Sequence, residues 1–248
     1  MLKLKLEESF DFVDYFIIVE SNKTFSGNSK PLLFENHKQE YKKYLSKIIH
    51  LTIKEFPSLT PWQSEHFQRN KAIDAINELK LKDDDLIIVS DIDEIFNQNV
   101  IKEIKQTGIS EPSCFELTQY YYNFNCKGVG QETYTYPSKI FTRSDLRQHN
   151  DTLQSMRNKR GPNNEMINVI KNGGWHLSFF GDADYIRNKI KSYAHQEFND
   201  PEFTDISKIN QRINDCKDIF NRSTSSWCRV EINQDSFLPI NRSILLND

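Results

Sequence analysis

A compact acidic group, Asp91-Ile92-Asp93-Glu94, follows directly after the apolar run Leu86–Val89. Two carboxylates one residue apart form an oxygen-ligand set of the kind that Mg²⁺ and Mn²⁺ prefer. A metal held there could neutralise the charge of a departing diphosphate. The same residues could also form a solvated acidic turn, since charged side chains are usually exposed. The preceding apolar run favours the metal site, because it places the acidic group at the end of a buried strand.

A phosphatase is a second hypothesis for the same residues. An aspartate after a buried strand, followed two residues later by another aspartate, is also the arrangement of haloacid-dehalogenase-type phosphatases. Those enzymes usually place Thr or Val after the second aspartate, whereas Glu94 and Ile95 follow it here. A third carboxylate beside a phosphorylated aspartate would repel the substrate. We therefore rank a phosphatase-like hydrolase below group transfer.

The elements that must position the acidic group alternate between apolar and amphipathic segments. The first residues suit an amphipathic helix better than a strand. Thr60, Pro61 and Gln63 mark a helix start with a capping box, and that helix is expected to run through Leu79. The other predicted elements are strands at 15–19, 48–53, 86–89, 114–124 and 139–142, and helices at 100–108, 182–193 and 206–216. This order predicts an α/β fold with a mixed sheet flanked by helices, which binds ligands at the carboxyl ends of its strands.

Two segments interrupt this pattern. Residues 143–164 are polar and basic and predict a loop or lid, in which Arg157, Lys159 and Arg160 could close over a diphosphate. Gly173 and Gly174 predict a second break, where the backbone could approach a ligand closely.

Composition limits the class of protein. The 248 residues, with 37% hydrophobic and 27% charged, suit a globular chain with a full core, and the net charge of −3 gives no basic surface for nucleic acid. No apolar stretch is long enough to span a membrane. The four cysteines contain no CxxC pair, which argues against a zinc site, and we expect free thiols in a reducing compartment.

Several segments, taken in order, resemble glycosyltransferase family 17. They cover roughly residues 2–200, and the matching pieces are Val13–Ser21, Thr24–Gly27 with Lys30-Pro31, Gln68-Arg69, Ser90–Ile95, Gly173–Ser178, Lys189–Ser192 and Ala194-His195. The resemblance implies a GT-A-like (Rossmann-like) fold and inverting transfer of a sugar, GlcNAc, from a UDP-sugar to a glycan hydroxyl. The implied partners are therefore a nucleotide-sugar donor and a glycan or glycoprotein acceptor.

The resemblance also implies roles for individual residues. The metal, Mn²⁺ or Mg²⁺, would be held by Asp91, Asp93 and His176. Contacts with the nucleotide-sugar are expected from Glu20, Gln68, Arg69, Trp175 and Lys189, with Trp175 stacking on a sugar and Lys189 meeting diphosphate oxygens. An inverting transfer needs a carboxylate that takes the acceptor proton; the candidates are Glu165 and, after Gly181, Asp182 or Asp184, and of these we choose Glu165. Asp182 would also serve as an ordinary helix cap.

The expected organisation is a catalytic domain over residues 1–200 and a helical C-terminal extension over 201–248 packed on it. Members of the family carry an additional first strand that helps bind the base, and the resemblance implies that this chain lacks it or builds the base site differently. A non-catalytic binding remnant of a transferase therefore stays an alternative. The expected compartment is the cytoplasm, as for microbial or viral relatives, or the Golgi lumen if an upstream anchor is missing from this chain.

Overall fold

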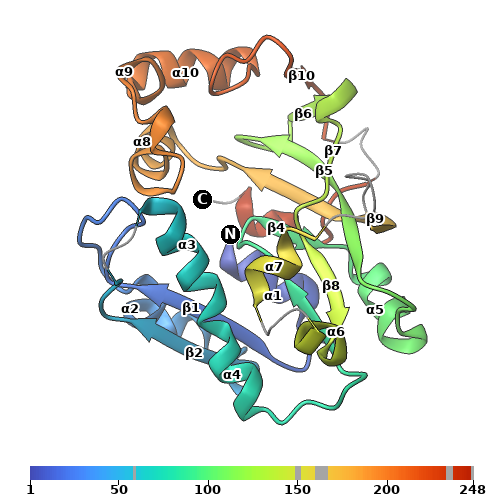
Figure 1. Ribbon diagram of the computed structural model, residues 1–248. Coiled ribbons are helices and arrows are strands. Elements are labelled where there is room, and N and C mark those ends of the chain that lie inside the picture. Colours follow the sequence, from blue (N-terminus) through green and yellow to red (C-terminus); the bar gives the residue numbers. More distant parts are fainter. Residues whose placement is uncertain (58–59, 149–151, 160–166, 233–236, 247–248) are drawn as a thin grey trace.

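The computed structural model describes residues 1–57, 60–148, 152–159, 167–232 and 237–246. It is a mixed α/β structure with two sheets, a small parallel pair and a larger, mainly antiparallel sheet of eight strands (Figure 1). The predicted α/β class with a mixed sheet and flanking helices is therefore confirmed.

Five of the ten strands that the structure describes follow the predicted runs at 15–19, 48–53, 86–89, 114–124 and 139–142, and the other five were not predicted. The strands are β1 (Phe16–Ser21), β2 (Ile48–Ile53), β3 (Leu86–Val89), β4 (Glu94–Phe96), β5 (Ser113–Tyr121), β6 (Cys126–Val129), β7 (Tyr134–Thr135), β8 (Lys139–Thr142), β9 (Asn168–Ser178) and β10 (Ser226–Arg229). β1 and β2 pair in parallel, with Phe16 opposite Ile48 and Ser21 opposite Ile53. The large sheet has the order β10-β6-β5-β8-β3, and β9 joins it by pairing in parallel with β5.

The α-helices include those predicted from capping and periodicity. They are α1 (Leu2–Ser9), α2 (Leu33–His37), α3 (Pro61–Asn70), α4 (Ala72–Glu78), α5 (Gln98–Thr107), α6 (Arg143–Gln148), α7 (Leu153–Arg157), α8 (Ala183–Ser192), α9 (Pro201–Thr204) and α10 (Ile206–Asp215). The capping box at Thr60 and Gln63 is present. The single helix expected beyond it is instead two helices, α3 and α4, which meet at Lys71.

The predicted loop or lid over residues 143–164 is wrong for its described part. It contains α6 and α7, and Leu146, Leu153 and Met156 are buried against β3 and β8 residues such as Val89 and Phe141. The segment is polar overall, but its three buried apolar side chains are enough to pack two short helices against the sheet.

The predicted break at Gly173 and Gly174 is also wrong, because both residues lie inside β9. A Cβ atom on Gly173 would lie 2.9 Å from the Phe115 Cβ, and one on Gly174 would lie 2.0 Å from the Ile95 carbonyl oxygen. Gly174 also has φ +147°. The glycines therefore allow neighbouring strands to approach one another; they do not mark a point where the backbone meets a ligand.

The C-terminal segment is not only helical. α10 packs with α8 and α9, whereas β10 adds a strand to the edge of the large sheet by pairing with β6. Ile186, Ile190 and Ile209 form a core with Tyr121, Tyr122 and the last helices.

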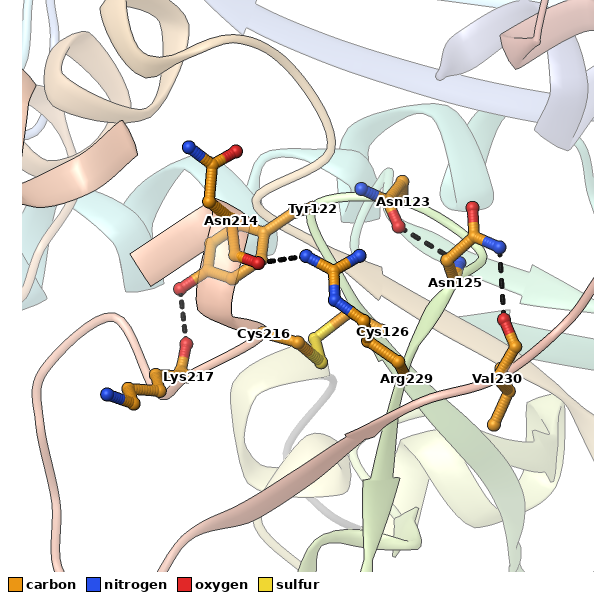
Figure 2. Close-up of a disulfide and its surroundings, with 9 residues drawn as sticks. All are labelled: Tyr122, Asn123, Asn125, Cys126, Asn214, Cys216, Lys217, Arg229 and Val230. Carbon is orange, nitrogen blue, oxygen red and sulfur yellow. Dashed lines mark hydrogen bonds between the residues drawn. A yellow bond between two sulfur atoms is a disulfide. The ribbon is translucent and has the colours of Figure 1, made fainter. Parts of the chain in front are cut away.

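Cys126 and Cys216 form a disulfide, so the expectation of free thiols is wrong for this pair (Figure 2). Their Cα atoms lie 5.5 Å apart, although 90 residues separate them in the sequence. Beside the bond, the Tyr122 hydroxyl donates to the Lys217 carbonyl oxygen over 2.7 Å. The disulfide thus joins β6 of the large sheet to the end of α10, while Cys114 and Cys228 are free thiols.

In the described part of the chain, no helix is both long and apolar enough to cross a membrane.

Candidate functional site

A cavity of about 1670 Å³ lies beside the acidic group. It is lined by residues of α1, β1, α3 and β3, and by Lys189 and His195 from the region of α8. β1 pairs only with β2 and β3 pairs only with β8 in the described chain, so the two sheets stay separate where both border this cavity. The acidic turn follows β3, as the strand-end argument predicted.

Asp91 stands between two arginines at the mouth of this cavity. One of its carboxylate oxygens is 3.2 Å from an Arg69 guanidinium nitrogen, and the other is 2.6 Å from Arg157. Its side chain is 43% exposed. Arg69 comes from α3 and also contacts Glu65 and Gln154, so α3 and α7 are tied together over the acidic turn.

Asp93 faces α8 and β9. One carboxylate oxygen is 2.7 Å from the Lys189 ammonium, and the other is 3.8 Å from His176 Nε2. Burial opposes ionisation of Asp93, but Lys189 and His176 outweigh it and hold the pKa of this carboxyl well below its usual value. Asp93 is therefore an anion whose second oxygen points toward an imidazole nitrogen.

Glu94 is buried under the turn, with its side chain only 2% exposed. It accepts hydrogen bonds from Arg157 at 2.6 Å, from the Ser138 hydroxyl, and from the Asp91 backbone N–H at 3.0 Å. Burial favours the neutral acid, yet Arg157 dominates and lowers the pKa of Glu94 to about 2. Glu94 thus fixes the backbone of the turn and the position of Arg157.

Lys5 of α1 lies on the other side of the turn. Its ammonium donates to the Ser90 hydroxyl and to the carbonyl oxygens of Asp91 and Glu94, at 2.9, 2.8 and 2.6 Å. Burial lowers the pKa of Lys5 to about 8. Three hydrogen bonds from one side chain hold the turn from below.

The cluster holds equal numbers of basic and acidic side chains, although burial and the neighbouring Glu94 raise the pKa of Asp91. Lys5, Arg69, Arg157 and Lys189 supply four positive charges, and the facing carboxylates are Glu65, Asp91, Asp93 and Glu94. An anionic ligand would upset this balance unless a further cation came with it.

Of the remaining residues predicted to contact the nucleotide-sugar, Gln68 lies near the charged cluster and Glu20 does not. Gln68 lines the cavity and donates to the Val19 carbonyl oxygen at 3.1 Å, so it ties α3 to β1. The Glu20 carboxylate accepts from the backbone N–H groups of Phe34 and Glu35 at the start of α2, and it lies 2.8 Å from His50. Glu20 is thus engaged in holding α2, away from the acidic turn.

Trp175 does not face the cavity. It is 3% exposed, packs in the core with residues such as Leu4 and Tyr120, and donates its indole N–H to the Phe237 carbonyl oxygen at 3.0 Å. This position gives no support to the predicted sugar stacking. Asp182 caps α8 by accepting from the Tyr185 N–H at 2.8 Å, which is its simpler predicted role. Glu165 lies outside the described residues, as does Arg160.

A divalent cation fits the acidic turn only in part. No group of three or more His, Cys, Asp or Glu side chains within the described ranges is arranged to hold a metal. Asp93 and His176 do present two donors 3.8 Å apart, and two ligands about 2.1 Å from one ion are separated by about 3 to 4 Å. Mg²⁺ and related ions are commonly held by one or two protein groups together with substrate phosphates. The pair therefore fits a metal that a diphosphate helps to bind, while Asp91 is occupied by its arginines.

Sequence reasoning missed Lys5 and the structural role of Glu94. The available signal for Lys5 was its place between Leu4 and Leu6 in an amphipathic helix, both of which are buried. Arg157 was expected above a diphosphate, whereas it contacts Asp91 and Glu94 directly.

The fold and the site define a class: an α/β protein with a cluster of charged side chains beside a cavity at the end of a sheet strand. The family model of glycosyltransferase family 17 matches residues 1–242, and the chain belongs to that family. The resemblance carried by the ordered segments is thereby confirmed, and the family match gives no support to the phosphatase hypothesis.

Curated relatives carry more specific names. The beta-1,4-mannosyl-glycoprotein 4-beta-N-acetylglucosaminyltransferases of Homo sapiens and Rattus norvegicus are each 29% identical to this chain over 140 residues. The aligned region is 52% of this chain and 26% of each relative, so the chain spans about a quarter of the relatives' length. No solved structure matches the chain.

Proposed function

We propose that this chain is a GT-A-like, metal-dependent, inverting glycosyltransferase that moves GlcNAc from a UDP-sugar to a glycan hydroxyl. The observation that carries the proposal is the juxtaposition of Asp93, His176 and Lys189 at the cavity beside β3. Family membership supports the transfer of a sugar. The relatives' names suggest GlcNAc as the sugar and a β-mannosyl glycoprotein as the acceptor.

The equal numbers of basic and acidic side chains in the cluster support a requirement for a divalent cation. A nucleotide diphosphate adds negative charge beside Asp91 and Asp93, and both carboxylates would repel it. Asp93 and His176 would hold the Mn²⁺ or Mg²⁺, and Asp91 would join them if its arginines turned toward the phosphates. When bound, the ion supplies charge neutralisation for the departing diphosphate.

The chain's own cations would orient the donor. Lys189 and Arg157 already reach the carboxylates and lie on the cavity wall, so small side-chain movements would bring them to phosphate oxygens. Arg69 on α3 would do the same from the opposite side of Asp91. Lys5 and Glu94 would keep the turn fixed during this exchange of partners, since their bonds are to backbone and buried groups.

The proton acceptor and the compartment stay predictions. Glu165 is the carboxylate proposed to take the acceptor proton, and the cap held by Asp182 disfavours that alternative. The Cys126–Cys216 disulfide argues against the predicted cytoplasmic location, because disulfides are rare in reducing compartments.

Calorimetric titration with UDP and UDP-GlcNAc, with and without MnCl₂, tests the proposal. We expect Mn²⁺-dependent binding, and a loss of about tenfold or more in affinity in Asp93→Asn and in His176→Ala. Asp184→Asn is the matched control for donor binding, because Asp184 is exposed and pairs only with Arg187 in the described contacts of α8. Binding that ignores Mn²⁺, or that survives in both variants, would refute the metal site. Metal-dependent binding without transfer to any glycan would instead favour the binding remnant.

A further inference from the structure

We infer that Trp62 and His195 form a stacking platform for a neutral sugar ring of the acceptor, at the rim of the cavity that holds the acidic turn. This inference rests on the proposed transferase function. It assigns a second subsite, adjacent to the charged cluster and sharing Glu65 with it, to side chains of α3 and of the segment after α8.

The two rings form a partly exposed pair. Their centroids are 4.3 Å apart with an interplanar angle of 78°, so one ring meets the other edge to face. Trp62 is 39% exposed, unlike the buried Trp175. Both Trp62 and His195 line the same cavity as Asp91 and Asp93. A large aromatic side chain held at a cavity rim by a second ring offers a rigid apolar surface to a ligand.

Two segments of the cavity lining connect the charged cluster to this pair, one on α3 and one running from α8 to His195. On α3, Trp62 and Arg69 are seven residues apart, so they project to the same side of the helix and are separated by about 10 Å along its axis. On the facing wall, Lys189 binds Asp93, and the chain continues from α8 to His195. Figure 1 shows the start of α3 next to α8, in agreement with the contact between the two rings. A short saccharide could therefore span from the platform to the cluster.

The groups around the platform suit a neutral, hydroxyl-rich ligand. Glu65 lies on the cavity wall one turn after Trp62, and Glu197 is exposed and bonded to His195 Nδ1 at 2.6 Å. Carboxylates accept hydrogen bonds from sugar hydroxyls and repel phosphates. The indole N–H of Trp62 has no protein acceptor among the described contacts and can donate to a ring substituent. This chemistry favours an acceptor sugar over the base and phosphates of the donor.

The test is a saturation-transfer NMR titration of the full chain with β-1,4-mannobiose and with chitobiose, alongside calorimetry with UDP and MnCl₂. We expect one of the sugars to bind, and Trp62→Ala to weaken that binding about tenfold. Trp62→Phe should weaken it less, since it keeps a ring. Tyr134→Ala, at an exposed tyrosine of β7 outside the cavity lining, is the control and should change nothing. UDP binding should be equal in all four proteins.

Three outcomes would overturn the platform: sugar binding unchanged in Trp62→Ala, UDP affinity reduced as much as sugar affinity, or no sugar binding by the wild-type protein. Loss of UDP binding in Trp62→Ala alone would identify a base-stacking residue instead. Each of these leaves the proposed function standing if wild-type UDP binding still depends on Mn²⁺. Failure of that wild-type binding would defeat the proposed function itself.

Discussion

Arg157 neutralises a buried carboxylate, so its replacement has a calculable effect on stability. In Arg157→Met, Glu94 would keep its bonds to Ser138 and to the Asp91 N–H but lose its cation. A buried carboxylate that has lost its paired cation either stays charged at a high cost or takes up a proton. Either course destabilises the fold at pH 7, since the unfolded chain ionises the same group freely in water.

The magnitude follows from the pKa of Glu94. Its value of about 2 lies below the ordinary 4.5 mainly because Arg157 outweighs the effect of burial. One pKa unit corresponds to about 1.4 kcal/mol, so the ionised form gains about 3 kcal/mol from folding. This gain is net of the burial penalty and includes His176 and Ser138 as well as Arg157, so it is not the share of Arg157 alone. The loss expected for Arg157→Met is that of a broken buried ion pair, about 3 to 5 kcal/mol.

Urea denaturation at pH 7 measures this loss, and a second variant isolates its cause. Adding Glu94→Gln to Arg157→Met should restore much of the stability, because an amide carries no charge and its oxygen can accept both remaining bonds. Arg187→Met is the control. Arg187 pairs with the exposed Asp184, and such surface pairs contribute less than about 1 kcal/mol.

The same pair predicts a pH dependence. The folded state holds Glu94 ionised at a pH where the unfolded chain binds a proton, so the unfolded state binds more protons between pH 4.5 and about 2. The stabilisation is fully present above pH 4.5 and is lost as the pH falls toward 2. Wild-type stability should fall more steeply than that of Arg157→Met in this window. Parallel pH curves, or a double variant no more stable than Arg157→Met, would refute the reasoning.

Two further changes test the frame around the site. Cys216→Ser opens a disulfide loop spanning 90 residues, and the chain-entropy estimate for its stabilisation is about 4 to 5 kcal/mol. We expect calorimetry to show a melting temperature lowered by roughly 10 °C. A shift below about 2 °C would mean that Cys126 and Cys216 are not bonded in solution. Gly174→Ala places a Cβ atom 2.0 Å from the Ile95 carbonyl oxygen, at a φ that L side chains rarely adopt. The free energy of unfolding measured by urea denaturation should therefore fall by about 3 kcal/mol or more. Unchanged stability would refute the close approach of β9 and β4.

Local signals in the sequence were sufficient for β1, β2, β3, β5 and β8, for the longer α-helices and for the position of the acidic turn. The capping box at Thr60, the apolar run Leu86–Val89 and the stop at Gly108 each depend on residues within a few positions of one another. Such patterns act through backbone hydrogen bonds and local φ values, so they can be recognised without tertiary structure.

Contacts across long separations could not be predicted in this way. Lys5 meets the acidic turn from 85 or more residues away, and Cys216 reaches Cys126 across 90 residues. Both depend on how the helices dock on the sheets, which is decided by side-chain packing among distant segments. The Trp62–His195 pair is of the same kind, although each residue lies in a segment whose local structure is simple.

The assignment of Trp175 and His176 to one site shows how a wrong local structure misleads a functional prediction. Neighbouring residues in a strand point to opposite faces of the sheet. Once Gly173 and Gly174 belong to β9, only one of the two side chains can face the cavity. Trp175 lies in the core, so His176 must project from the other face, where it lies opposite Glu94 in β4 and reaches Asp93. A large apolar ring gains more from burial than an imidazole does, and this preference decides which of the two neighbours enters the core. The imidazole is thereby left on the face that borders the acidic turn.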